Sequence, residues 1–300
     1  VPVSMRILIT GGAGFIGSHI VDELSKGKSN RITVLDNFYS GSLENIKQHL
    51  KNKDIRIIKG DVRDFNSFKK IGNVDIVYHL AAQSNVAGSF FKPDYAFSSN
   101  VIGTYNALKY SSGQKVKMFV FSSSREVYGN PEYVPVDEMH KLGPINMYGA
   151  TKVCGEALCN AFSRAGLNLT ILRIANSYGP RDKGRVIPLF IKNAKNNKDL
   201  QLFGGHQVLD FIWVGDVINA MIKASKNAEF IGETVNIGAG TGTSIEDLAK
   251  IIIKLTGSKS KIARKKARSF DVQMFISKSS KIKLKTAKLV DGLKKTIGFY

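Results

Sequence analysis

Thr10-Gly11-Gly12-Ala13-Gly14-Phe15-Ile16-Gly17 is the stretch that decides the fold of this chain. A short apolar run at residues 7–9 precedes it and is typical of a buried parallel strand. After the glycines, apolar residues recur at helical spacing, at positions 16, 20, 21 and 24. The order of strand, glycine turn and helix predicts a dinucleotide-binding unit at the start of the chain.

Three glycines and one acid in this region match what such a unit requires. Gly11 allows a tight turn, Gly14 lets the backbone approach a pyrophosphate, and Gly17 lets the helix pack closely on the strand. The helix N-terminus then offers free N–H groups to the phosphates. Asp36 ends the next apolar run, where an acid accepts hydrogen bonds from ribose hydroxyls. Because its charge repels a 2′-phosphate, Asp36 favours NAD over NADP, and the surrounding elements make a chance glycine-rich turn the weaker interpretation.

Tyr148 and Lys152 form the second informative motif, because they stand four residues apart and share one face of a predicted helix. A phenol has a pKa of about 10 in water, and a neighbouring ammonium and a cationic nicotinamide ring both favour its ionised form. We therefore expect a lowered pKa for Tyr148, as a general base near neutral pH requires. Ser124 ends the preceding strand and is placed to bind the same substrate oxygen. A surface Tyr and Lys pair is the alternative, and the upstream nucleotide unit favours the catalytic interpretation.

Strands and helices alternate along the first part of the chain. Further strands are predicted at residues 55–58, 74–79, 116–121 and 169–173, and helices at 42–50, 65–71, 94–112 and 147–165. This order predicts an α/β fold with a Rossmann-type, doubly wound parallel sheet, whose ligands lie beyond the carboxyl ends of the strands. We predict an NAD-binding domain at residues 1–176, and we leave residues 1–4 out of the fold prediction.

The later residues, 177–300, predict a smaller α/β substrate-binding domain that is partly interwoven with the first. Helices are expected at residues 186–196, 215–225 and 244–256, and one short strand at 235–237. The Lys- and Ser-rich stretch 258–285 has little periodicity, so no element is assigned there.

Charge narrows the choice of partners. The chain has 44 Lys and Arg residues against 24 Asp and Glu, which gives a formal net charge of +20. Such a surface attracts polyanions, and the basic residues are densest at 258–268. No aromatic residue interleaves with that cluster, so the sequence offers no base-stacking platform and we expect no nucleic-acid partner. A lysine-rich surface suits a doubly charged nucleotide substrate better.

The two cysteines, Cys154 and Cys159, lie five residues apart on one predicted helix. This low cysteine content favours a reducing, cytoplasmic compartment. The His and Cys residues are not spaced as metal ligands, so we expect no metal. No apolar run approaches the roughly 20 residues of a membrane span, and we expect no membrane segment and no signal peptide.

Together these motifs resemble the extended short-chain dehydrogenase/reductases, and among them the nucleotide-sugar epimerases and dehydratases typified by UDP-galactose (UDP-glucose) 4-epimerase. The matching stretches begin at Thr10 and include 36–37, 60–62, 79–83, 100–104, 122–129, 148–152, 176–181 and 210–214. The resemblance implies NAD as the cofactor, a nucleotide-diphosphate sugar with UDP as the substrate, and a homodimer. It implies that the dimer pairs the helix after Tyr148 and the helix near 100–112 with their mates.

The same resemblance implies a role for each matching residue. The implied catalytic residues are Ser124, Tyr148, Lys152 and Glu126. The implied cofactor contacts are Gly11, Gly14, Phe15, Ile16, Gly17, Asp36, Asn37, Asp61, Val62, Leu80, Ala81, Ala82, Gln83, Asn100, Ser122, Tyr148 and Lys152. The implied substrate contacts are Ser124, Asn176, Arg185, Val186, Phe203 and Arg268.

The resemblance also implies a reaction, the 4-epimerisation of a sugar through a transient ketone. Tyr148 as a phenolate takes the proton from the 4-hydroxyl, and hydride leaves C4 for NAD⁺. The 4-keto sugar turns over and accepts hydride on its other face, so that the enzyme-bound cofactor is regenerated. Ser124 polarises the oxygen throughout.

Two positions depart from the pattern of the epimerases. Relatives usually carry an arginine that grips the diphosphate where this chain has Leu209, and Arg181, Arg185 or Arg268 could substitute. Glu126 stands where family dehydratases use an acid to remove the C5 proton, which favours dehydration. Arg125 replaces an aspartate of several dehydratases and argues against it.

The leading interpretation is therefore a UDP-glucose/UDP-galactose 4-epimerase. The main alternative is a nucleotide-sugar 4,6-dehydratase or decarboxylase that uses Glu126. The competing interpretation of Glu126 is a structural carboxylate that pairs with Arg125 or a lysine. Another reductase and a non-catalytic nucleotide sensor are the remaining hypotheses.

Overall fold

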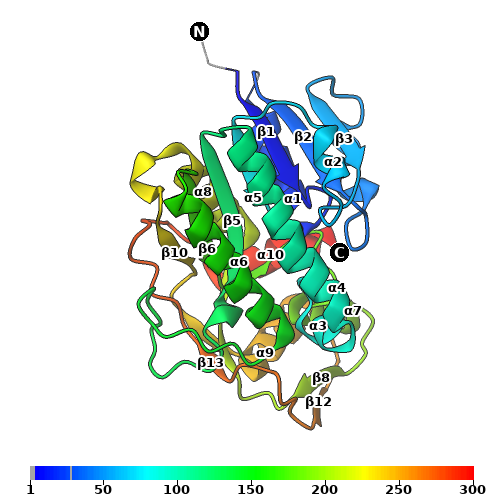
Figure 1. The fold of residues 1–300 in the computed structure, drawn as a ribbon. Coiled ribbons are helices and arrows are strands. Elements are labelled where there is room, and N and C mark those ends of the chain that lie inside the picture. Colours follow the sequence, from blue (N-terminus) through cyan, green and yellow to red (C-terminus); the bar gives the residue numbers. More distant parts are fainter. Residues whose placement is uncertain (1–3, 28) are drawn as a thin grey trace.

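The computed structural model describes residues 4–27 and 29–300, which build a seven-stranded parallel sheet at the centre of the molecule (Figure 1). The strand order is β10-β6-β5-β4-β1-β2-β3, which confirms the predicted doubly wound α/β fold. The order reverses between β1 and β4, and ligands of such sheets bind at that point. The strands are β1 (Arg6–Thr10), β2 (Arg31–Asp36), β3 (Ile55–Lys59), β4 (Ile76–His79), β5 (Met118–Ser124), β6 (Leu169–Ile174) and β10 (Thr234–Ile237).

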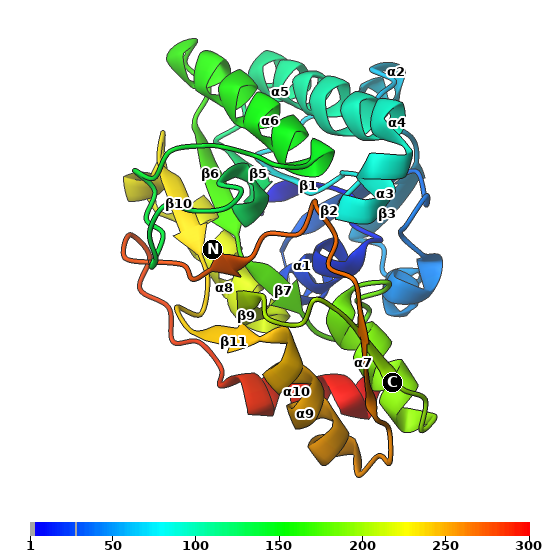
Figure 2. The same ribbon diagram turned by 90° about the horizontal axis from the view of Figure 1, so that it is seen from below.

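Helices cover both faces of this sheet. In Figure 2, α5 (Gly103–Gly113) and α6 (Met147–Arg164) lie on one side of it, and α1 (Phe15–Ser25) and α8 (Val214–Lys226) lie on the other. The predicted helix at 94–112 consists of α4 (Pro93–Phe97), a π-helical segment (Ser98–Ile102) and α5. The shorter helical elements are Leu43–His49, α2 (Asn66–Lys69), α3 (Val86–Phe91), Arg125–Val127 and Ala228–Phe230.

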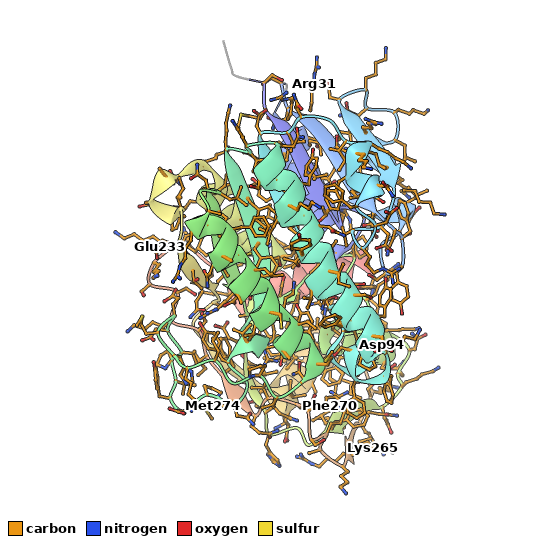
Figure 3. All side chains as sticks on the ribbon, viewed as in Figure 1. Arg31, Asp94, Glu233, Lys265, Phe270 and Met274 are labelled. Carbon is orange, nitrogen blue, oxygen red and sulfur yellow. The ribbon has the colours of Figure 1, made fainter. Side chains whose placement is uncertain are left out.

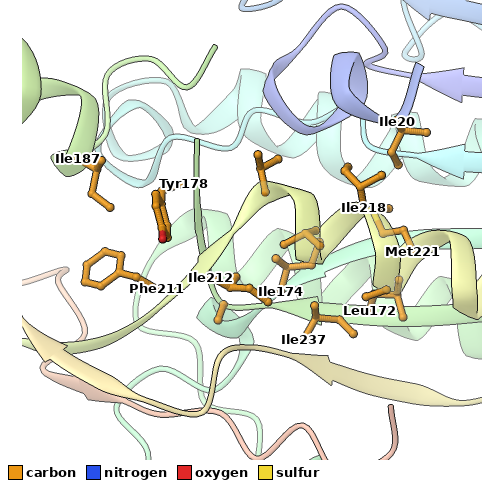
Figure 4. Packing of buried hydrophobic residues seen from close by; sticks show 14 of the residues in the cluster. Ile20, Leu172, Ile174, Tyr178, Ile187, Phe211, Ile212, Ile218, Met221 and Ile237 are labelled. Atoms are coloured by element: carbon orange, nitrogen blue, oxygen red, sulfur yellow. The ribbon is translucent and has the colours of Figure 1, made fainter. Parts of the chain in front are cut away.

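The side chains of β1 explain why both faces need a cover. Leu8 joins an apolar cluster with Phe119 and Leu108, under α5 and α6. Ile7 and Ile9 point the other way, into a larger cluster with α1 and α8. Figure 4 shows part of the larger cluster, in which Ile20 of α1 and Met221 of α8 lie near Leu172 of β6. A strand buried on both faces is continuously apolar, as the run at 7–9 is.

A smaller layer lies below the carboxyl ends of the large sheet (Figure 1). Its central strand β9 (Val208–Trp213) pairs with β11 (Gly242–Ser244), β13 (Met274–Phe275) and β7 (Asn176–Tyr178). A separate pair joins β8 (Leu200–Phe203) to β12 (Ile262–Lys265). The helices of this layer are α7 (Val186–Lys195), α9 (Ile245–Thr256) and α10 (Leu289–Phe299).

The chain crosses between the two layers more than once. After β9 it returns to the large sheet, where β10 pairs with β6 in parallel. The boundary at residue 176 stays a prediction, and residues 1–3 of the excluded stretch 1–4 lie outside the described residues. Among residues 4–27 and 29–300, the structure has no helix with the length and apolar character that crossing a bilayer requires.

The stretch 258–285, to which the sequence assigned no element, contains β12 and β13. Both strands are short, and β12 is mostly exposed, so neither leaves an alternating apolar pattern. They form because β8 and β9 offer them unpaired edges, which is information from distant parts of the chain. Figure 3 shows Lys265 and Phe270 of this stretch at the lower end of the molecule.

Candidate active site

The glycine loop between β1 and α1 is packed so closely that side chains cannot fit at two of its positions. Gly11 has a φ of +71°, and a Cβ on it would lie 2.8 Å from the Ala81 nitrogen. A Cβ on Gly17 would lie 2.1 Å from the Gly11 carbonyl oxygen. A Cβ on Gly14 would meet only that same oxygen, at 3.1 Å, so the backbone there is open to a ligand. This cradle fits a pyrophosphate.

Asp36 is a buried hydrogen-bond acceptor at the end of β2. Its Oδ2 accepts from the Ala13 N–H at 2.9 Å, and its Oδ1 accepts from the Phe38 N–H at 2.8 Å. Burial raises the pKa of this carboxyl, and the two backbone hydrogen bonds oppose the rise. Two bonds leave lone pairs on both oxygens, so the side chain is fixed in place with capacity for ribose hydroxyls.

A first cavity of about 220 Å³ lies over the glycine loop and Asp36. Most of the predicted cofactor residues line it: Gly11, Gly14, Phe15, Ile16, Gly17, Asp36, Asn37, Val62, Leu80, Ala81, Ala82, Ser122, Tyr148 and Lys152. Together with the cradle, this lining fits NAD. Tyr39 and Tyr95, which sequence reasoning missed, also line it, and their rings lie 4.3 Å apart.

The other three predicted cofactor residues, Asp61, Gln83 and Asn100, lie behind the lining. Asp61 accepts a hydrogen bond from Asn37 at 2.9 Å. Burial raises the pKa of Asp61, but hydrogen bonds from Arg63 and Asn37 outweigh burial and lower that pKa to about 2. Asp61 is thus an ionised group that orients Asn37 toward the cavity.

Asn100 connects the loop after β4 to the helix that carries Tyr148. Its Oδ1 accepts from the Gln83 N–H at 2.7 Å, and its Nδ2 donates to the Gln83 carbonyl at 3.1 Å and to Thr151 Oγ1 at 2.9 Å. The Thr151 hydroxyl donates in turn to the Tyr148 carbonyl at 2.8 Å. Asn100 therefore positions the start of α6 against the cavity wall.

Ser124, Tyr148 and Lys152 meet on the wall of the first cavity. Ser124 ends β5, and its hydroxyl lies near enough to the Tyr148 phenol to lower the pKa of that group. Lys152 Nζ donates to the Ser122 carbonyl at 2.7 Å and lies 5.8 Å from the centre of the Tyr148 ring. The three residues predicted as catalytic thus come from the ends of two adjacent elements, β5 and α6.

The prediction that the protein lowers the pKa of Tyr148 is wrong. Burial raises the pKa of Tyr148 to about 12, and the hydroxyl of Ser124 and the charges of Arg185 and Arg125 offset only part of the rise. Burial also lowers the pKa of Lys152 to about 8. Desolvation disfavours both ions and here outweighs the favourable effect of the lysine charge, because both groups are buried.

Glu126 is held in a buried ion pair. Arg125 Nη2 lies 2.7 Å from Glu126 Oε1, and Asn146 Nδ2 donates to Glu126 Oε2 at 2.7 Å. Each side chain of the ion pair is 8% exposed. Arg125 Nη2 also donates to Asn176 Oδ1 at 3.3 Å. Of the two interpretations of Glu126, the pairing with Arg125 is the one that the geometry supports.

A second cavity of about 490 Å³ adjoins the first. Arg125, Glu126, Asn176, Ser177 and Arg185 line both cavities, so the two meet beside Ser124 and Tyr148. Five of the predicted substrate residues line the second cavity: Asn176, Arg185, Val186, Phe203 and Arg268. Sequence reasoning missed Gln207 and Phe270, because nothing in the sequence near them indicated a site.

Leu209 forms an apolar part of the second cavity, so no cation stands at that position. Of the three arginines that could replace one, Arg185 and Arg268 line this cavity. Arg185 donates to Asp182 at 2.8 Å and stacks 4.9 Å from the Phe15 ring centre. Arg181 lies 2.7 Å from Asp22 and, within the described residues, lines neither cavity.

A sequence model of the NAD dependent epimerase/dehydratase family matches residues 7–238 of this chain. A Methanocaldococcus jannaschii protein, provisionally named a UDP-glucose 4-epimerase, is 40% identical over 255 residues, which cover 82% of this chain and 81% of that protein. A UDP-N-acetyl-alpha-D-glucosaminuronate decarboxylase of Bacillus cytotoxicus is 38% identical over 275 residues, covering 86% of this chain and 82% of that enzyme.

Solved structures agree with the sequence comparison. The Thermotoga maritima UDP-glucose 4-epimerase, crystallised with UDP-glucose, superimposes with a TM-score of 0.92 at 34% identity. The match covers 98% of each chain. The relatives therefore include both an epimerase and a decarboxylase at similar identity, and NAD is the cofactor of the family.

Gly17→Ala should weaken NAD binding by roughly tenfold or more, because the added methyl displaces the loop whose N–H groups meet the pyrophosphate. Gly298→Ala is the matched control, since a Cβ on this helical glycine would meet nothing within 4 Å. Isothermal titration of each purified variant with NAD measures the effect. Wild-type affinity in Gly17→Ala would mean that the loop does not hold the cofactor.

Proposed function

Because this chain belongs to the NAD dependent epimerase/dehydratase family, we propose that it is a nucleotide-sugar 4-epimerase of the UDP-glucose/UDP-galactose type. The observation that carries the proposal is that Ser124 and Tyr148 line the same cavity, which fits NAD and opens beside them to a second cavity. The epimerases among its relatives support the same reaction.

The proposed chemistry needs a base and a hydrogen-bond donor at one sugar oxygen. Tyr148 as a phenolate removes the proton of the 4-hydroxyl, while the Ser124 hydroxyl donates to that oxygen. NAD, when bound, supplies the acceptor for the C4 hydride and later returns it. The Lys152 ammonium lies near the Tyr148 ring on the same face of α6, and its positive charge favours the phenolate. The 4-keto sugar then rotates in the space where the two cavities meet.

The second cavity suits the nucleotide part of a UDP-sugar. Val186 and Phe203 offer apolar surface for a base, and Arg268 lies 4.8 Å from the Phe203 ring centre. Arg185 stands where the two cavities meet, between a base at one end and a sugar at the other. We assign the diphosphate to Arg185 and Arg268, in place of the arginine that Leu209 replaces.

A second candidate is a nucleotide-sugar dehydratase or decarboxylase that uses Glu126. The observation in its favour is that Glu126 lines both cavities, and a decarboxylase is among the relatives. Both Glu126 oxygens are engaged, Oε1 in the ion pair with Arg125 and Oε2 in a hydrogen bond from Asn146, which weighs against a free base. The epimerase is therefore the function that the geometry supports better.

The enzyme, incubated separately with UDP-glucose, UDP-galactose and UDP-GlcNAc, should convert at least one of them into its C4 epimer. Proton NMR detects that product. Tyr148→Phe should lower the rate by roughly a hundredfold or more, because the general base is lost.

Since burial raises the pKa of Tyr148 to about 12, the phenolate fraction and the rate should rise with pH around neutrality. A 4-keto-6-deoxy product, or loss of CO₂ from a UDP-uronate, without any epimer would replace this proposal by the second candidate.

Arg185→Ala should raise the KM for the UDP-sugar by roughly tenfold or more, because a charge-assisted contact with the diphosphate is lost. Arg181→Ala is the matched control: both arginines pair with an aspartate, and only Arg185 lines the cavities. Steady-state kinetics of the two variants test the assignment. Equal KM values for Arg185→Ala and Arg181→Ala would move the diphosphate to other residues.

We further propose a homodimer through α5 and α6. These helices lie side by side on the outside of the sheet (Figure 1), and Phe97, Ile102 and Tyr105 beside them are 45%, 42% and 44% exposed. Sedimentation velocity should give twice the mass of one chain, and Ile102→Glu should give the monomer, since a charge in an apolar interface is costly. Leu43→Glu, at an exposed leucine outside these helices, is the control, and a monomeric wild type would refute the dimer.

A further inference from the structure

The chemistry of a 4-epimerase, on which this inference rests, creates a hazard inside its own site. A ketone at C4 acidifies the protons on the two neighbouring carbons, C3 and C5. A carboxylate that reaches one of them removes the proton, and the electron pair of that C–H bond forms the double bond of an enolate. An epimerase gains nothing from this step, since enolates scramble configuration or eliminate water. A site that handles 4-keto sugars therefore has to restrain any carboxylate in it.

Glu126 is the carboxylate to which this applies. It follows Ser124 by two residues and lines both cavities, and its charge raises the pKa of Tyr148. It is therefore near the oxygen on which the proposed reaction takes place. A glutamate with free lone pairs at this position would be a competent base for the ketone.

We propose that Arg125 is a specificity-determining residue, which prevents Glu126 from enolising the 4-keto sugar by holding its carboxylate in an ion pair. Arg125 Nη2 lies 2.7 Å from Glu126 Oε1, and both side chains are 8% exposed. The ion pair occupies Oε1, so that oxygen is not free to take a proton from the sugar. Within the described residues, Arg125 Nη1 has no hydrogen-bond partner, and Glu126 is the carboxylate with which this guanidinium forms an ion pair.

Glu126 also has a structural task, which explains why a glutamate stands there at all. Its Oε2 accepts from Asn146 Nδ2 at 2.7 Å, and Asn146 is the N-cap of α6, accepting from the Gly149 N–H at 2.8 Å. Tyr148 lies in that capped turn. The contacts from Arg125 through Glu126 to Asn146 thus help to position Tyr148. They also keep both oxygens of the Glu126 carboxylate engaged.

Deuterium incorporation in D₂O separates this role from a merely structural one. The measured quantity is the deuterium gained at C3 or C5 of the UDP-sugar per epimerisation event, by NMR and mass spectrometry. In the wild type this ratio should be close to zero. In Arg125→Ser it should rise at least about tenfold, because the freed carboxylate removes a proton and a deuteron from solvent returns. The ratio does not depend on how fast the variant turns over.

Matched variants keep the test decisive. Arg125→Lys retains the charge and should keep the wild-type ratio, whereas Arg125→Gln, which fills similar volume without charge, should behave as Arg125→Ser and replaces it if that variant does not fold. Adding Glu126→Gln to Arg125→Ser should remove the exchange. Arg264→Ser, which breaks an exposed pair with Glu246, is the control for loss of an arginine and should keep the wild-type ratio.

The outcomes distinguish this inference from the proposed function. A wild type that makes the C4 epimer but incorporates deuterium at C3 or C5 overturns the role of Arg125 alone. A wild-type ratio in Arg125→Ser and Arg125→Gln, each with epimerisation still measurable, overturns it as well. A wild type that makes no C4 epimer from any UDP-sugar refutes the proposed function.

Discussion

Desolvation of the paired Tyr148 and Lys152 is the constraint on which the proposed chemistry depends. The same burial raises the pKa of the phenol to about 12 and lowers that of the ammonium to about 8, so the cavity opposes charge on both groups. A phenolate forms readily only when further positive charge enters the cavity. The hydroxyl of Ser124 and the charges of Arg125 and Arg185 contribute part of the opposing effect, and the positive nicotinamide ring of bound NAD would add to it. Such a site is poised to be active only when loaded.

The protein behind the site is built to keep that dry geometry. Glu156 on α6 receives three hydrogen bonds from Arg173 of β6, at 2.7, 2.9 and 3.3 Å, and one from Ser123 of β5 at 2.5 Å. This buried group ties the helix that carries Tyr148 and Lys152 to the strand that carries Ser124. On the opposite side, Asn100 fixes the same helix to the loop after β4. Because each buried polar atom in this group has a partner, moving the helix would break several bonds at once.

What the sequence could predict was local, and what it missed was not. The glycine loop and Asp36 could be proposed because their requirements are set by neighbours in the chain, and the alternation of strands and helices led directly to the parallel sheet. The predicted direction of the Tyr148 pKa shift was wrong, because burial is a property of the assembled fold. Arg181 and Arg185 are equivalent in sequence terms, yet one pairs with Asp22 away from the cavities and the other lines both. Phe270 went unnoticed because its stretch takes shape only against β8 and β9.

The position of β10 has a consequence for how the chain is made. This strand is encoded after residue 233, yet it covers the edge of β6 in the large sheet. A nascent chain that ended soon after β6 would expose a buried-type strand with unpaired N–H and C=O groups, which other chains can pair with. The large sheet is therefore complete only after the ribosome has synthesised β10. Release before that point would favour aggregation, and chaperones that mask strand edges would matter most in this interval.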